Sequence, residues 1–113
     1  MDKMKGKHLI IDLKKCKHMP PYNEVYNLLE YLVKLVHMKK LSGPHIVNGA
    51  PYNPGITGFI IIETSHISIH TFEKDNSISM DLYSCKTFNH KNVLKEVMNT
   101  FQPKDIIYKI IPR

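Results

Sequence analysis

Residues 57–83, TGFIIIETSHISIHTFEKDNSISMDLY, contain three consecutive strand patterns and decide the fold. Thr57–Glu63 is a short apolar, β-branched run, which predicts a buried strand. His66–Thr71 and Ser77–Tyr83 alternate polar and apolar residues with a period of two, which predicts half-buried strands. The turn residues of segment 74–76 separate these two. Strands in such close succession predict an antiparallel sheet.

Two helix patterns and two further strand patterns flank this region. His8–Leu13 and Ile106–Ile111 have the apolar character of strands. In residues 24–40 the apolar side chains recur at steps of three and four, which predicts an amphipathic helix with Asn23 as its N-cap. A second helix pattern follows Asn89, and it places three apolar residues on its inward side: Val93, Val97 and Phe101.

Two segments that contain helix breakers divide these elements. The stretch from Ser42 to Gly55 is rich in Gly, Pro and Asn, which predicts a loop. Pro103 is expected to end the second helix. The order β-α-β-β-β-α-β then predicts an α+β fold, an antiparallel β-sheet with two helices packed on one face in a two-layer sandwich. The other face of the sheet is left for a partner or a site.

A length of 113 residues predicts a single domain, residues 1–113, with one core. This size excludes a large multi-domain cofactor enzyme, so an active site is either small or shared between copies of the chain. The longest apolar runs fall far short of the ~20 residues that cross a bilayer, so no membrane is expected. Two cysteines, Cys16 and Cys85, fit a reducing cytosol better than a disulfide framework, which predicts a cytoplasmic protein.

The net charge of +6 comes almost entirely from lysine. A basic surface permits phosphate binding. The sequence, however, lacks Trp, an arginine-rich stripe and the aromatic and glycine pattern of proteins that bind single-stranded RNA. We therefore expect solvated lysine faces and no nucleic-acid partner.

The residues with the most chemistry gather between Glu63 and Thr71. On a strand, His66 and His70 point the same way but lie about 13 Å apart, so these two cannot share one metal ion and no metal site is expected. The Gly-x-Ser-x-Gly elbow of a serine hydrolase is absent around Ser65. Taken alone, this cluster is typical of the polar face of a sheet.

Four spaced motifs change that interpretation. They are Gly55-Ile56-Thr57-Gly58, Ser65–Thr71, Asp81–Cys85 and Gly6-Lys7-His8-Leu9. They resemble four patterns of the prokaryotic-type S-adenosylmethionine decarboxylase proenzymes, a pyruvoyl-dependent decarboxylase family. In the same order, these patterns are G-(V/I)-(S/T)-G, E-S-H-(I/L)-x-I-H-T-W-P-E, D-(L/I)-(F/Y)-x-C and G-(R/K)-H-(L/V). The spacing from Ser65 to Cys85 agrees with this family without a gap. The resemblance covers most of the chain and is weakest in the two helices.

The resemblance implies that the chain cleaves itself. The Ser65 hydroxyl would attack the Thr64 carbonyl, and elimination and hydrolysis would leave a β chain of residues 1–64 and an α chain of residues 65–113 that begins with a pyruvoyl group. This self-derived group takes the place of pyridoxal phosphate, and no metal is implied. The substrate amine would form a Schiff base with the pyruvoyl group, whose carbonyl accepts the electrons released on decarboxylation.

Three further residues match the processing and catalytic positions of the family. His70 matches the base of the elimination step, and Thr57 matches a hydroxyl that assists processing. Cys85 matches the donor that protonates the substrate α-carbon after carbon dioxide leaves. The product would be decarboxylated S-adenosylmethionine, the aminopropyl donor for spermidine. Members of this type pair, so the resemblance also implies a four-layer homodimer with its sites at or near the dimer contact.

The chain departs from the family pattern near the cleavage site and at substrate-binding positions. Thr64 replaces the usual glutamate before the serine, and a β-branched residue there is expected to slow processing. Phe72-Glu73-Lys74 replaces W-P-E, so Glu73 would hold the ribose hydroxyls after a one-residue shift. Tyr52 would stack on adenine, also after a one-residue shift. We expect Tyr52, Phe72 and Glu73 to bind the substrate.

Two alternatives stay open. The eroded nucleoside contacts are compatible with a pyruvoyl-dependent arginine or ornithine decarboxylase on the same scaffold, because a free amino acid needs neither a ribose carboxylate nor an adenine stack. The altered Thr64 and Lys74 positions are compatible with a non-catalytic regulatory paralogue. Against the paralogue, Ser65, His70 and Cys85 are all present.

Overall fold

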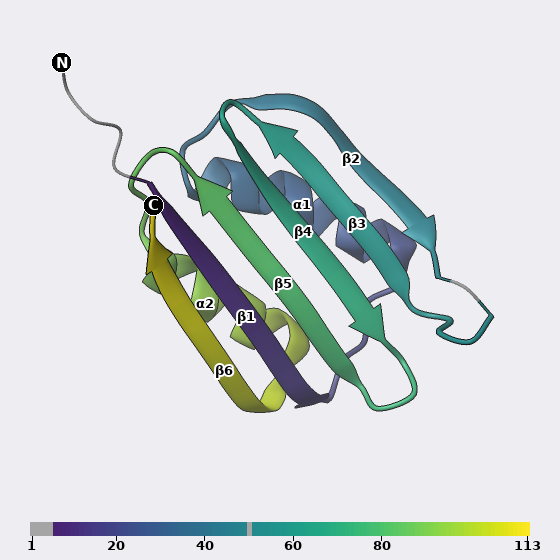
Figure 1. The fold of residues 1–113 in the computed structure, drawn as a ribbon. Helices are drawn as coiled ribbons and strands as arrows, with labels where there is room; N and C mark the ends of the chain where they lie inside the picture. The colour runs from purple at the N-terminus through teal and green to yellow at the C-terminus, as the bar shows by residue number, and fades with distance from the viewer. Residues whose placement is uncertain (1–5, 50) are drawn as a thin grey trace, which may run out of the picture.

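The computed structural model describes residues 6–49 and 51–113. Within them the chain forms six strands and two helices (Figure 1), with these bounds: β1 Lys7–Cys16, α1 Tyr22–Leu35, β2 Lys40–Asn48, β3 Ile56–Ile62, β4 Ser65–Phe72, β5 Ser77–Ser84, α2 His90–Phe101 and β6 Pro103–Pro112. The strands make one antiparallel sheet in the order β2-β3-β4-β5-β1-β6. The three strand patterns of residues 57–83 are therefore its neighbouring strands β3, β4 and β5.

Both helices cover the same face of the sheet (Figure 1). α1 contacts β2 and β3, and α2 lies behind the half of the sheet that contains β1 and β6. The core fills the space between the layers, where strand residues such as Leu9 and Ile67 and helix residues such as Leu29 and Phe101 are at most 1% exposed. The predicted α+β fold with two helices on one face is confirmed.

The loop predicted for segment 42–55 is wrong in its first half, because residues 42–48 belong to the edge strand β2. β2 pairs with β3 alone, and its register shifts between Lys40 and Ser42 and again between Ser42 and His45. Such irregularity accommodates Gly43-Pro44, because proline, which has no N–H for the ladder, is tolerated on an edge strand. The glycine and proline of this segment therefore lie in an irregular edge strand. The loop contains only residues that follow Asn48.

The first helix differs from its prediction at both ends. Its N-cap is Pro21 rather than Asn23, and no side-chain hydrogen bond caps it. It ends at Leu35, before the predicted Lys40, and His37 then adopts a left-handed φ of 58°. The reversal at His37 turns the chain back toward β2.

The second helix begins as predicted. The Asn89 side chain accepts hydrogen bonds from the backbone N–H groups of Lys91 and Asn92. Gln102, with a left-handed φ of 48°, ends this helix, and Pro103 opens β6 directly. The chain reverses in one residue, so the helix ends at Gln102 rather than at the proline.

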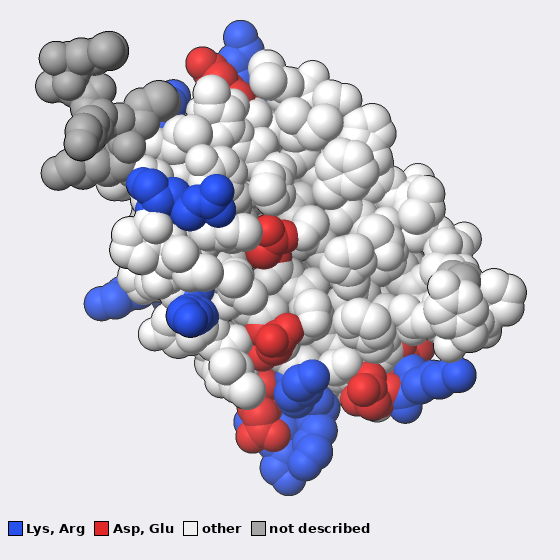
Figure 2. Space-filling view, in the orientation of Figure 1, with Lys and Arg blue, Asp and Glu red and all other residues white. Residues whose placement is uncertain are grey.

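The open face of the sheet lies opposite the helices. It faces the viewer in Figure 2, where it is largely uncharged, with acidic groups near its middle and basic groups toward its margins. Four apolar side chains on it are each at least 39% exposed: Val47, Phe59, Ile61 and Ile107. Exposed apolar side chains that share a face are typical of an interaction surface. Neither of the two described helices has the length and apolar character needed to cross a membrane.

Candidate active site

The turn between β3 and β4 is strained. Ile62 pairs with Ser65, so only Glu63 and Thr64 connect the two strands. Thr64 adopts a left-handed φ of 55°, a conformation that costs a β-branched residue about 1–2 kcal/mol. Its Oγ1 donates a hydrogen bond of 2.7 Å to the Glu63 carbonyl oxygen. The predicted scissile bond therefore directly follows a strained residue.

Ser65 begins β4 with its side chain on the helix-facing side of the sheet. The residue is 8% exposed, and within the described residues its Oγ is buried without a hydrogen-bond partner. An unsatisfied buried hydroxyl costs about 1–3 kcal/mol, so such a group calls for an explanation. A nucleophile that no neighbour engages is one such explanation.

Cys85 lies beside Ser65 at the same end of the sheet. Ser65 pairs with Ser84, and Cys85 is the next residue along the chain. The Tyr83 hydroxyl lies 3.4 Å from Cys85 Sγ, and this hydrogen bond raises the pKa of Tyr83 above its ordinary value. Gly6 packs so closely on the backbone of Ser84 and Cys85 that a side chain at position 6 would overlap it. The start of β1 thus holds the end of β5 in place.

Thr57 and His70 face one another on the open side of the sheet. They are direct partners in the β3–β4 ladder, and Thr57 Oγ1 lies 3.0 Å from His70 Nδ1. His70, however, is five residues from Ser65 on an uninterrupted strand, which is about 16 Å, and the odd spacing places it on the other face. One copy of the chain places Ser65 and Cys85 at one end of the sheet, and it places Thr57 with His70 toward the other end.

The predicted substrate residues lie toward the end of the sheet that is remote from Ser65. Phe72 ends β4, about 23 Å from Ser65 along the strand, and Glu73 is exposed in the following turn. Tyr52 lies between β2 and β3 and is 82% exposed. These residues share their end of the sheet with Thr57 and His70.

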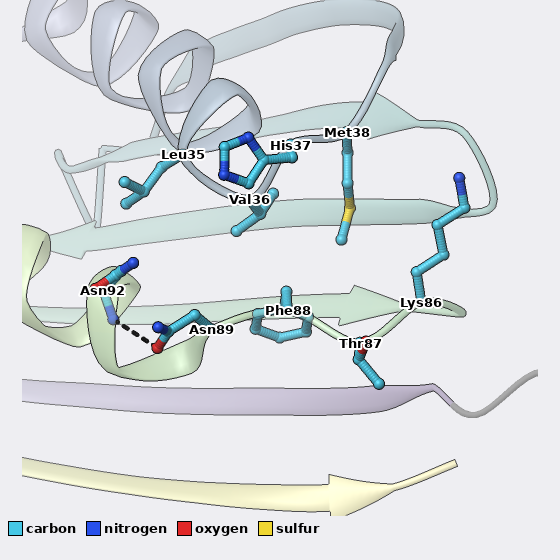
Figure 3. Close-up of a pocket in the computed structure, with 9 residues that line it drawn as sticks. All are labelled: Leu35, Val36, His37, Met38, Lys86, Thr87, Phe88, Asn89 and Asn92. Atoms are coloured by element: carbon cyan, nitrogen blue, oxygen red, sulfur yellow. Dashed lines mark hydrogen bonds between the residues drawn. The ribbon is translucent and has the colours of Figure 1, made fainter.

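Two hollows adjoin these groups. The larger, of about 600 Å³, separates the end of α1 from the segment that leads into α2 (Figure 3) and is lined by Leu35, Val36, His37, Met38, Lys86, Thr87, Phe88, Asn89 and Asn92. Its Met38 sulfur accepts a hydrogen bond of 3.6 Å from the Ser84 hydroxyl, beside Ser65. The second, of about 380 Å³, lies on the open face and contains Thr57 and His70. The sequence predicted neither, because the larger is lined by segments distant in sequence and the smaller depends on which side chains of the β3–β4 hairpin share the open face.

A polar cluster that was not predicted as a site surrounds Asp81 on the open face. Its carboxylate accepts hydrogen bonds from His8, His66 and Ser68. Burial raises the pKa of Asp81, but these three hydrogen bonds outweigh burial and hold it below its ordinary value. His8 and Asp81 stood in the sequence motifs, which signalled their presence but not their contact.

Among the described residues, a small α+β domain thus places a strained residue before a buried serine without a hydrogen-bond partner, an arrangement compatible with a self-processing proenzyme. The family model described as S-adenosylmethionine decarboxylase matches residues 7–113, and the chain belongs to this family.

Individual proteins that are similar to this chain carry the same family name. The S-adenosylmethionine decarboxylase proenzymes of Sulfurihydrogenibium sp. (strain YO3AOP1) and Persephonella marina (strain DSM 14350 / EX-H1) are 36% and 34% identical to this chain, over 100% of it and 85% of each relative. The crystal structure of the adenosylmethionine decarboxylase from Aquifex aeolicus VF5 matches with a TM-score of 0.79 and 25% identity, over 99% of this chain and 92% of that one.

These matches confirm the predicted family and the predicted enzyme class, a pyruvoyl-dependent decarboxylase. Nothing in them favours an arginine or ornithine decarboxylase or a non-catalytic paralogue.

Proposed function

We propose that this chain is an S-adenosylmethionine decarboxylase proenzyme that cleaves itself between Thr64 and Ser65. Cleavage yields residues 1–64 and residues 65–113, the latter beginning with a pyruvoyl group. The observation that carries the proposal is the Ser65 hydroxyl, buried and without a partner among the described residues, directly after left-handed Thr64. The product, decarboxylated S-adenosylmethionine, supplies spermidine synthesis in the cytoplasm.

The first step of processing needs only Ser65 and its neighbour. Ser65 Oγ attacks the Thr64 carbonyl carbon, the C–N bond of that peptide breaks, and the Ser65 nitrogen takes the proton, which leaves an ester. A base then removes the Ser65 α-proton, and Thr64 departs as a free carboxylate. The dehydroalanine left on the second fragment takes up water and loses ammonia. Backbone strain at Thr64 favours this first step, because cleavage releases it.

His70 is the proposed base of the elimination step. Its hydrogen bond with Thr57 holds the ring through Nδ1 and leaves Nε2 for the α-proton. Since about 16 Å of strand separates His70 from Ser65 in one chain, the base that serves Ser65 comes from a second copy.

We therefore propose a homodimer in which two open faces pack antiparallel in four layers. The Ser65 end of each copy then meets the Thr57–His70 end of the other. The exposed Phe59 and Ile61, which line the same hollow as this pair, supply apolar surface for that contact.

In the mature enzyme the pyruvoyl group supplies the electron-accepting carbonyl for decarboxylation. Cys85 delivers the proton to the substrate α-carbon, and Tyr83 orients its thiol. Tyr52, Phe72 and Glu73 of the other copy hold the nucleoside. Neither pyridoxal phosphate nor a catalytic metal takes part in these steps.

The intact mass of the purified, denatured protein tests the cleavage. We expect two fragments that meet at Thr64–Ser65, the C-terminal one lighter by one ammonia than hydrolysis alone would give. An uncut chain after prolonged incubation would contradict self-processing. Release of carbon dioxide from S-adenosylmethionine, and not from arginine or ornithine, would establish the substrate.

Co-expression of two inactive chains tests the shared site. Neither Ser65→Ala nor His70→Ala should be cut alone. In a mixed dimer, one site combines intact Ser65 of the His70→Ala chain with intact His70 of the Ser65→Ala chain. Mass spectrometry should therefore find the His70→Ala chain cut and the Ser65→Ala chain whole. If the mixture contains no cut chain, the two-copy site is wrong even where wild-type cleavage holds.

A further inference from the structure

Three metal-ligating side chains converge on the open face, outside the residues of the proposed decarboxylation. His8 comes from β1, His66 from β4 and Asp81 from β5. Asp81 Oδ2 lies 2.5 Å from His8 Nε2 and 3.2 Å from His66 Nε2, and the three ligand atoms lie within 4.8 Å of one another. His66 and His70 are too far apart on β4 to share one ion, but the fold places His66 beside His8 and Asp81 instead.

The register of three adjacent strands produces this convergence. Tyr83 of β5 pairs with His8 of β1 on one side and with His66 of β4 on the other. Asp81 lies two residues before Tyr83 on β5 and on the same face of the sheet. Both imidazoles therefore reach diagonally toward one carboxylate from opposite sides. The Tyr83 ring packs against both imidazole rings, with centroids 5.7 and 5.8 Å away, and limits their movement.

A further group orients the carboxylate. The Ser68 hydroxyl donates to Asp81 Oδ1, which leaves Oδ2 directed at the two imidazoles. Hydrogen bonds that orient a ligand in this way are a regular feature of protein metal sites. The His8, Asp81 and His66 side chains are 19%, 23% and 44% exposed in the single chain, so the cluster is pre-organised, and in the proposed homodimer it faces the contact between the two copies.

We propose that His8, His66 and Asp81 form a binding site for one divalent transition-metal ion of the zinc class. Two imidazole nitrogens with one carboxylate oxygen suit Zn²⁺, Co²⁺ or Ni²⁺, whereas Mg²⁺ and Ca²⁺ prefer sites made of oxygen alone. Three protein ligands leave a coordination position for water or a further group. The inference does not depend on self-cleavage or on decarboxylation.

Calorimetric titration of ZnCl₂ into the metal-free full chain tests the site. We expect one Zn²⁺ per chain and none of this binding with MgCl₂. His8→Gln and His66→Gln should each weaken zinc binding by at least about tenfold, since loss of outer-sphere partners alone costs metal sites 10–100-fold. His45→Gln is the matched control, because His45 lies on β2, pairs opposite Phe59 and hydrogen-bonds with Ser42. It should leave zinc affinity unchanged.

Wild-type protein that binds no Zn²⁺, or variants that bind it as well as wild type does, would overturn the proposal. A Co²⁺ spectrum of the wild-type chain keeps the test decisive if a histidine variant fails to fold. Ligation by nitrogen and oxygen predicts a spectrum without a thiolate charge-transfer band. Such a band would instead place the ion on a cysteine and would refute the assignment.

Discussion

The two ends of strand β4 differ in how their polar groups are satisfied. At one end Thr64 is strained, and the Ser65 hydroxyl is buried with no partner in the part of the chain that the structure describes. Toward the other end, Thr57 and His70 are hydrogen-bonded to each other. An unsatisfied buried group is costly to keep, whereas hydrogen-bonded neighbours hold each other in one geometry. This difference fits the proposed homodimer, in which a second copy would bring the two pairs of residues together.

Removal of the Ser65 hydroxyl tests the difference between the two ends of β4, and it has the largest expected effect. Ser65→Ala should abolish both cleavage and decarboxylation, because no other group forms the ester. Intact-mass measurement and carbon dioxide release from S-adenosylmethionine provide the readouts. Ser79→Ala, which loses a hydrogen bond to Asp12 on the neighbouring β5–β1 pair, is the matched control and should be cut normally. Full activity of Ser65→Ala would refute the pyruvoyl mechanism.

Loss of the Cys85 thiol, at the Ser65 end of the sheet, should lower the rate of decarboxylation without preventing self-cleavage. Cys85→Ala should still be cut, while kcat should fall about 10²–10⁴-fold, the usual contribution of a positioned proton donor. Single-turnover assays on the cut protein measure it. Cys16→Ala, which alters the buried cysteine of the core, should keep kcat close to that of wild type. An uncut Cys85→Ala chain would instead give the thiol a role in processing.

Relief of the strain should slow cleavage without removing any reacting group. Thr64→Gly accepts a left-handed φ freely, so the uncut chain loses about 1–2 kcal/mol of strain and cleavage should slow by about tenfold. The time course of fragment appearance measures this rate. Asn76→Gly changes another left-handed residue, in the turn between β4 and β5, and should not alter cleavage. Faster cleavage of Thr64→Gly would show instead that the β-branched side chain hinders processing.

The smallest expected effect concerns the orientation of the thiol. Tyr83→Phe removes the hydroxyl that lies 3.4 Å from Cys85 Sγ, and one such hydrogen bond is worth about 1 kcal/mol. The rate of Cys85 alkylation by iodoacetamide should therefore change by about fivefold, and kcat should fall by a similar factor. Tyr26→Phe on the exposed side of α1 is the control. Unchanged alkylation and kcat in Tyr83→Phe would mean that Cys85 is positioned by its backbone alone.

Much of this protein was predictable from local sequence. The alternation in Ser77–Tyr83 and the apolar periods of α1 and α2 each depend on nearby residues, so these elements were predicted correctly, although the Asn23 cap was not. The order of elements then predicted helices on one face of an antiparallel sheet. Strand β2 was missed because Gly43-Pro44 is typical of a loop, and only pairing with β3 keeps that segment extended.

The candidate site also has features that the sequence predicted and features that only the fold revealed. The sequence alone determined the family, and motif spacing marked Ser65, His70 and Cys85 as its candidate residues, because such spacing is read without any knowledge of contacts. Only the tertiary structure decided that the Ser65 hydroxyl has no partner among the described residues, that His70 lies on the opposite face, and that His8 and His66 meet at Asp81. These facts depend on strand register and on which side chains share a buried layer, and both are set by packing between residues far apart in the chain.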